Sequence, residues 1–195
     1  MMSDMSMAIP AANVDTTDEG PVERALREGA YRDAVALSAR LHGAPLGRLC
    51  MAMLGSQAEA EECVQEVLIA AEAAFKGYRG EGSVRAFLFG IARRMCARKL
   101  EQRGRREAHL RAVQGPRADL GTPEHTLLLR QRAERVRGAL ERLKPTERDA
   151  VVLRYQAGLD YREIAAACGI DEPAARKRVS RGLARMKDLL GEDAR

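Results

Sequence analysis

The sequence predicts an all-α protein made of two small helical domains joined by a flexible linker. Three observations favour this fold class. The chain of 195 residues is 46% hydrophobic and 31% charged but only 4% aromatic, without the runs of Val, Thr and Tyr that are typical of sheets. Apolar residues recur at helical spacing from Pro21 onward. That periodicity stops between residues 107 and 125, where glycines and prolines predict the linker.

The first domain is expected over residues 21–106, after a disordered tail of residues 1–20. A short helix ends at Gly29, a second follows, and a break at Gly43–Pro45 precedes a third apolar stripe. A longer helix over Gln57–Lys76 combines one apolar face with acidic residues on its other faces. These acidic faces are either a solvated surface or a docking surface for a partner protein.

A glycine-rich turn, Gly77–Gly82, presents Tyr78 and Arg79 before a helix that Ser83 can cap. The stripe expected to be buried on that helix consists of Val84, Phe87, Leu88, Ile91 and Met95. Between residues 93 and 106 the helix carries seven basic residues and one acidic residue. This is more positive charge than a helix C-terminus requires, so contact with a polyanion is expected.

The second domain is expected over residues 126–191 as four helices, of which the last two form a helix-turn-helix. Asp160 and Glu163 suit a capping box, Gly169 suits the end of that helix, and Asp171 can cap the next one. The outward face of the last helix carries Arg176, Lys177, Ser180 and Arg181. Such a face suits DNA phosphates and base edges, and the alternative is a basic, solvated helix of an ordinary bundle.

The remaining reactive side chains give no sign of catalysis. Cys50, Cys63, Cys96 and Cys168 show no metal-ligand spacing and are interpreted as small buried hydrophobes in a reducing compartment. No metal, cofactor or enzymatic activity is expected, because no nucleophile lies near a plausible base. The N-terminus lacks a secretory signal and no apolar run is long enough to span a membrane, so a cytoplasmic protein without membrane insertion is expected.

Three motifs resemble those of bacterial RNA polymerase sigma factors. They are EECVQEV (Glu61–Val67), YRGEGSVRAFLFGIARR (Tyr78–Arg94) and LKPTERDAVVLRYQAGLDYREIAAACGI (Leu143–Ile170). The short two-domain form resembles the extracytoplasmic-function (ECF) group, and three motifs in the right order are far more specific than a helix-turn-helix alone. The resemblance implies a transcription initiation factor that binds core RNA polymerase and directs it to promoter DNA.

The resemblance also assigns roles to individual residues. Candidate contacts with core polymerase are Glu62, Gln65 and Glu66. Candidate contacts with the minus-10 promoter element are Tyr78, Arg79, Phe87, Arg93, Arg94 and Arg98. Stacking of an unpaired base on an aromatic ring there is worth about 1–3 kcal/mol. The candidate minus-35 residues are Arg176, Lys177, Ser180 and Arg181. An anti-sigma factor is an expected further partner.

The sequence departs from the family pattern in three places. Glu72 and Phe87 stand where the family often has Trp, and Arg94 stands where Asn is usual. Pro173–Ala175 replace a more usual Gly-Thr-Val, so the promoter preference is not implied. The alternative function is a stand-alone helix-turn-helix transcriptional regulator. That alternative leaves the acidic and basic helices of the first domain without a role, and the relative orientation of the two domains stays open.

Overall fold

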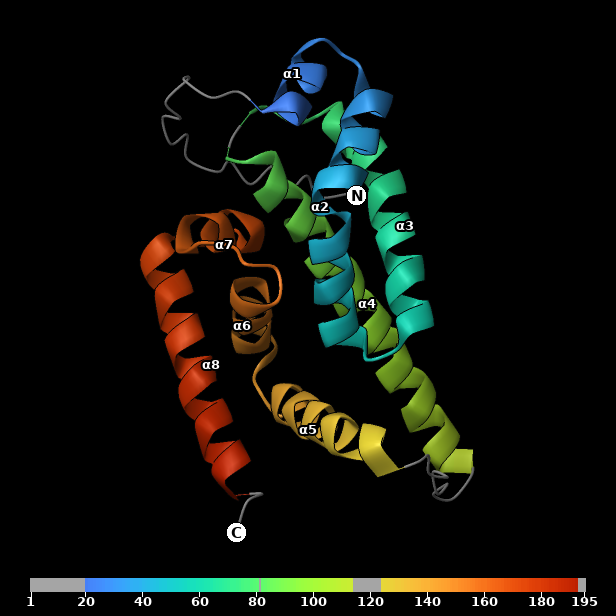
Figure 1. Ribbon diagram of the computed structural model, residues 1–195, viewed down its shortest axis with the longest axis vertical. Helices are drawn as coiled ribbons and strands as arrows, with labels where there is room; N and C mark the ends of the chain where they lie inside the picture. Colours follow the sequence, from blue (N-terminus) through green and yellow to red (C-terminus); the bar gives the residue numbers. More distant parts are fainter. Residues whose placement is uncertain (1–19, 81, 114–123, 193–195) are drawn as a thin grey trace, which may run out of the picture.

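The computed structural model describes residues 20–80, 82–113 and 124–192, and within these ranges the chain forms eight helices and no strand. Figure 1 shows them as α1 (Pro21–Arg27), α2 (Tyr31–Leu54), α3 (Gln57–Phe75), α4 (Val84–Val113), α5 (Glu124–Glu141), α6 (Pro145–Tyr155), α7 (Tyr161–Cys168) and α8 (Glu172–Glu192). The all-α fold of two helical domains is therefore confirmed, with four helices in the second. None of the described helices is long and apolar enough to cross a membrane. The predicted tail, except Gly20, lies outside the described residues.

Helix α2 shows that the break predicted at Gly43–Pro45 is wrong. The helix is continuous from Tyr31 to Leu54, with Pro45 in its interior. An interior proline costs about 3 kcal/mol, because it removes a hydrogen bond and clashes with the preceding turn. Leu46 and Leu49, one and four residues after the proline in the same helix, are fully buried. Full burial of one leucine contributes about 1.5–3 kcal/mol, so the core contacts of α2 offset its proline.

Helix α4 is buried on two faces, whereas the sequence predicted one. Of the expected stripe, Phe87 and Met95 are only half-buried. The helix buries additional residues, namely Ala86, Phe89, Ala92 and Cys96. The reason is that α4 packs against α2 and α3 and also against α7 of the second domain.

Helix α4 also extends into the predicted linker. It continues to Val113, so residues 107–113 of the predicted linker are helical. Residues 114–123 lie outside the described residues.

The local signals of the helix-turn-helix are confirmed. The Asp160 carboxylate accepts a hydrogen bond from the Glu163 backbone N–H at 2.7 Å, and Glu163 accepts one from the Asp160 N–H at 3.0 Å. Gly169 ends α7 with a left-handed φ of 65°, which glycine adopts without strain. Asp171 caps α8 by accepting a hydrogen bond from the Ala174 N–H at 2.7 Å. Caps of this kind are typically worth about 1 kcal/mol each.

The two domains pack against each other. Helix α7 lies against α4, and α6 approaches α2 (Figure 1). Gly90 of α4 permits the close approach, because a Cβ atom added there would lie 3.2 Å from the carbonyl oxygen of Ala167. The Arg85 guanidinium donates a hydrogen bond to the carbonyl oxygen of Ala157 at 2.6 Å. As a result, one hydrophobic core runs through both domains.

Candidate functional site

Helix α3 presents an outward face that contains a large apolar side chain. Glu62, Gln65 and Ile69 are spaced three and four residues apart, so they share one side of the helix. Ile69 is 73% exposed. Glu62 and Gln65 are predicted contacts, whereas Ile69 was not predicted; its only signal in the sequence is that it lies off the apolar stripe of this helix. The α3 face, made of Glu62, Gln65 and Ile69, therefore combines polar groups with an apolar side chain whose exposure to water is unfavourable.

Two acidic residues of this helix share one lysine of α4. The Lys99 ammonium donates to Glu62 at 2.9 Å and to Glu66 at 3.0 Å. The hydrogen bond with Glu62, assisted by Glu66, raises the pKa of Lys99. The side chain of Glu62 is 63% exposed and that of Glu66 is 44% exposed. Because one positive charge faces two negative charges, the α3 face remains acidic and accessible.

Tyr78 and Phe87 form an aromatic cluster with Phe75. The ring centroids of Tyr78 and Phe87 are 5.1 Å apart, and those of Phe75 and Phe87 are 6.1 Å apart. The Tyr78 hydroxyl donates to the carbonyl oxygen of Gly82 at 2.5 Å, and burial raises the pKa of Tyr78 to about 12. The two aromatic residues predicted to contact the minus-10 element are thus held in contact with each other, and both are half-buried.

The basic residues predicted on this side of the molecule lie in two different environments. Arg79, Arg94 and Arg98 are exposed. The Arg93 guanidinium instead contacts the Asp149 carboxylate of α6 at 3.0 Å. Asp149 is 5% exposed, and a buried carboxylate needs such a partner. Arg93 therefore bridges the two domains.

A second polar contact between the domains lies at Glu163. Its carboxylate receives a hydrogen bond from the Ser83 hydroxyl at 3.3 Å and one from the Arg85 guanidinium at 3.0 Å. Ser83 also caps α4, as expected, by accepting from the Ala86 N–H at 3.0 Å. Ser83 and Glu163 were predicted only as capping residues. The structure adds that both hold α7 against the first half of α4, the helix expected to contact the minus-10 element.

The outward face of α8 is free of this interface. Its four predicted residues, Arg176, Lys177, Ser180 and Arg181, are all exposed. The Arg176 guanidinium contacts Glu172 at 2.5 Å and lies 4.4 Å from the centroid of the Tyr161 ring, a cation–π geometry that orients it. The structure thus places all four side chains together on one accessible helix face.

A basic groove of about 560 Å³ extends this face toward α6. It is lined by Arg142, Lys144, Glu147, Arg181 and Arg185. Four of these five residues are basic, which suits the phosphates of a nucleic acid. The groove was not predicted. Its signal in the sequence is the pair of basic residues just before Pro145, but these precede a different helix from the one that carries Arg181.

Three of the four cysteines also come together. Cys50, Cys63 and Cys96 are fully buried, as predicted, and their sulfur atoms all lie within 4.8 Å of one another. Cys168 on α7 is half-buried and is not part of this cluster. Among the described residues this is the group whose side chains could hold a metal ion. Sequence spacing did not indicate it, because each sulfur comes from a different helix.

Comparison with known families matches both domains. The model of Sigma-70 region 2 matches residues 39–106, and that of Sigma-70, region 4 matches residues 133–186. The chain is 34% identical over 148 residues to the ECF RNA polymerase sigma factor SigD of Mycobacterium tuberculosis, with 72% of this chain and 69% of SigD covered. It is 29% identical over 155 residues to the ECF RNA polymerase sigma factor SigE of Mycolicibacterium smegmatis, with 78% and 60% covered.

Solved structures share the fold. CnrH, in complex with the cytosolic domain of CnrY, aligns with a TM-score of 0.66 at 23% identity over 88% of this chain and 99% of CnrH. The sigma factor RpoE of Bartonella quintana, in complex with the anti-sigma factor NepR, aligns with a TM-score of 0.58 at 23% identity over 83% of this chain and 97% of RpoE. Since both sigma regions occur in order and the identity to SigD extends over two thirds of both chains, the protein belongs to the ECF RNA polymerase sigma factors.

Proposed function

We propose that this initiation factor uses three separate surfaces to bring core RNA polymerase to a promoter in the cytoplasm. The α3 face binds polymerase, the Tyr78 turn with α4 binds the minus-10 element, and α8 with the basic groove binds the minus-35 element. The observation that carries the proposal is the exposed basic face of α8 on a helix-turn-helix whose caps and turn are complete. No catalytic role is proposed for any residue.

The minus-35 surface suits both the shape of the DNA major groove and the negative charge of the phosphates. A recognition helix enters the major groove with its N-terminal residues nearest the base edges, which places Arg176, Lys177 and Ser180 close to the bases. Arg181 and the groove residues Arg142 and Lys144 are then positioned for phosphates. Phosphate contacts fix the orientation on DNA, whereas base contacts provide the sequence preference.

The minus-10 surface is partly covered in the closed arrangement of the two domains. Ser83, Arg85 and Arg93 contact residues of the second domain, and Gly90 packs on Ala167. We propose that α7 moves away from α4 before the minus-10 element binds. Binding of polymerase to the α3 face and of DNA to α8 would favour the open arrangement if both ligands prefer it.

An anti-sigma factor is proposed as a further partner. RpoE of Bartonella quintana is held by the anti-sigma factor NepR. In this chain the exposed Ile69 on the acidic α3 face offers such a partner an apolar anchor. A protein bound there would exclude polymerase while leaving the domains closed.

Transcription by purified core polymerase on genomic fragments, with and without this protein, tests the proposed function. Discrete new RNA starts, each preceded by a shared minus-35 and minus-10 element, are expected. A stand-alone regulator would instead give no new starts and would bind one DNA site by itself, with a dissociation constant of about 10⁻⁸ M or lower at physiological salt. That second result would contradict the proposal.

Replacing Ile69 by serine is expected to weaken binding to core polymerase at least about fivefold, since anchor side chains at the centre of an interface contribute more than about 1 kcal/mol. The free energy of unfolding should change by less than about 0.5 kcal/mol, because Ile69 is exposed. Fluorescence anisotropy of labelled protein titrated with core polymerase measures the affinity. Leu41→Ser on α2 is the matched control, because Leu41 is 51% exposed but off the α3 face. Equal affinities of the two variants for core polymerase would show that Ile69 is not part of the interface.

A further inference from the structure

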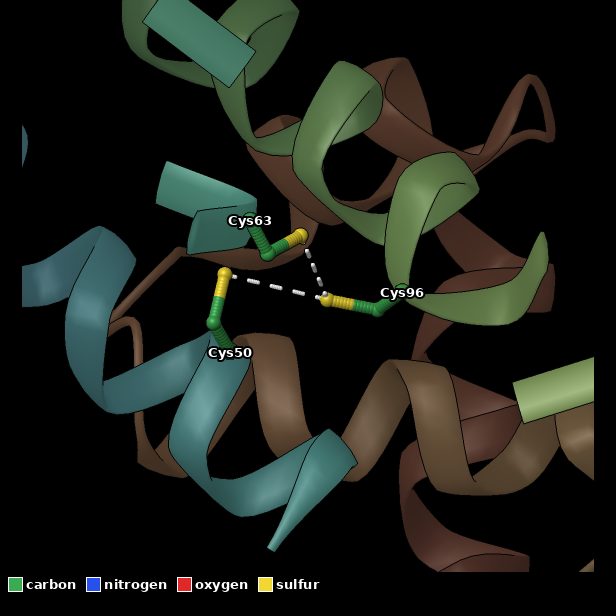
Figure 2. Close-up of side chains that lie close together, drawn as sticks. All are labelled: Cys50, Cys63 and Cys96. Carbon is green, nitrogen blue, oxygen red and sulfur yellow. Dashed lines mark hydrogen bonds between the residues drawn. The ribbon is translucent and has the colours of Figure 1, made fainter. Parts of the chain in front are cut away.

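The core of the first domain contains a cluster of three thiols that the roles proposed above do not use. Cys50 lies on α2, Cys63 on α3 and Cys96 on α4. The Cys96 sulfur is 3.7 Å from the Cys63 sulfur and 3.7 Å from the Cys50 sulfur. Figure 2 shows the three side chains pointing toward a common centre from three different helices. All three residues are fully buried.

The two separations of 3.7 Å are close to those between sulfur ligands of one metal ion, and the third pair of sulfurs, Cys50 and Cys63, lies within 4.8 Å. A zinc–thiolate bond is about 2.3 Å long, so two sulfurs on one tetrahedral or trigonal ion lie about 3.8–4.0 Å apart. Thiols that merely pack together also approach to a similar distance. Ligation additionally requires all three sulfurs to converge on one point from separate helices, and this cluster provides that convergence. A disulfide would need a separation of about 2.05 Å and would leave one thiol over.

Ligation requires the three thiols to ionise. As each metal–sulfur bond forms, the thiol that supplies it loses its proton to solvent.

The number and type of ligands select the ion. In the described part of the chain, the group contains three sulfurs and no histidine or carboxylate. Soft thiolate ligands favour Cu(I) and Zn(II) over the harder divalent ions. Structural Zn(II) is almost always bound by four ligands, which a buried three-sulfur site does not supply. We propose that Cys50, Cys63 and Cys96 form a three-thiolate binding site for a soft metal ion, with Cu(I) as its preferred occupant.

The position of the site gives it a structural consequence. It joins α2, α3 and α4 at their common core, and α3 and α4 carry the α3 face and the Arg93–Arg98 segment. A bound ion therefore restrains the helices that carry both surfaces. Because the sulfurs are fully buried, the ion must enter during transient opening of the domain, and its exchange should be slow.

Transfer of Cu(I) from a coloured chelator to the full-length, fully reduced protein under anaerobic conditions tests the proposal. One equivalent is expected to transfer, with an X-ray absorption spectrum that shows three sulfurs at about 2.3 Å and with a raised melting temperature. Cys63→Ala should lose this equivalent, and Cys168→Ala, outside the cluster, should keep it. Circular dichroism verifies that both variants are folded, and Cys50→Ala and Cys96→Ala provide the same test at the other two ligands.

Three results would overturn the site. They are retention of the equivalent by a folded Cys63→Ala protein, an absorption spectrum of the wild-type complex with fewer than three sulfurs, and failure of the reduced wild-type protein to bind Cu(I) or Zn(II). A parallel titration with Zn(II) and a zinc chelator distinguishes the two ions. Stoichiometric Zn(II) that Cu(I) cannot displace would overturn the preference for Cu(I). These readouts do not involve transcription, so they are independent of the proposed function.

Discussion

Replacement of Gly182 by leucine is expected to lower the free energy of unfolding by about 2–3 kcal/mol. Helix α8 crosses α6 at this residue, and a Cβ atom there would lie 2.6 Å from a Val151 methyl carbon and 3.3 Å from the Glu147 carbonyl oxygen. Forcing extra carbons into such a contact typically costs about 1–3 kcal/mol, and the branched leucine side chain lies at the upper end. The higher helix propensity of leucine compared with glycine offsets less than about 1 kcal/mol of this loss.

Thermal and urea unfolding, followed by circular dichroism, measure this change. For a chain of this size the expected loss corresponds to roughly 4–12 °C in melting temperature. Gly191→Leu is the control in the same helix, because a Cβ atom at Gly191 meets nothing within 4 Å. Equal melting temperatures for the two variants would show that α8 does not cross α6 at Gly182. With the crossing displaced, the minus-35 face should also lose its position beside the basic groove.

The contrast between Gly182 and the capped ends of α7 shows what the sequence could predict. Asp160, Glu163 and Gly169 act within a few residues of one another, so their spacing was enough to place the helix ends. The role of Gly182 depends on Val151, which lies on another helix. A glycine within a helical pattern has no local signature of close packing, because the same residue at Gly191 contacts nothing. Long-range contacts decide between the two.

The same distinction explains the errors in α2 and α4. Pro45 is a local signal for a break, but the core burial of Leu46 and Leu49 outweighs it. The second buried face of α4 depends on α7, which lies far along the chain. The candidate site follows this pattern. The exposed residues of α8 could be placed from helical spacing alone, whereas the pairing of Arg93 and the cysteine cluster required the tertiary structure.

Replacement of Arg93 by alanine is expected to shift the free protein from the closed to the open arrangement by about 3 kcal/mol, or roughly 100-fold. Removing one partner of a buried ion pair typically costs about 3–5 kcal/mol, because the remaining charge is left without compensation. The expected value of about 3 kcal/mol is at the low end of this range because the Arg93 side chain is 22% exposed, so the ion pair is only partly buried. Within the described part of the chain, Arg93 Nε and one Asp149 oxygen also lack hydrogen-bond partners and regain water on opening.

Small-angle scattering measures this opening as a larger radius of gyration. Arg98→Ala is the matched control, because Arg98 lies on the same helix and is exposed. The double variant Arg93→Met with Asp149→Leu should remain closed, since apolar residues of similar volume replace buried ion pairs at little cost or with a gain. If Arg93→Ala and Arg98→Ala scatter alike, the ion pair does not hold the domains together in solution.

Transcription then separates the two roles of Arg93, as a bridge between domains and as a candidate minus-10 contact. Asp149→Ala removes the bridge but leaves Arg93 available to DNA, so it should open the protein and support at least as much initiation as the wild type. Arg93→Ala should open the protein to a greater degree than Asp149→Ala does. It should nevertheless support less initiation than Asp149→Ala, because a phosphate or base contact is lost with the bridge. If both variants open but initiate equally, Arg93 serves only the closed arrangement, and the minus-10 contact must be made by Arg94, Arg98 and the Tyr78 turn.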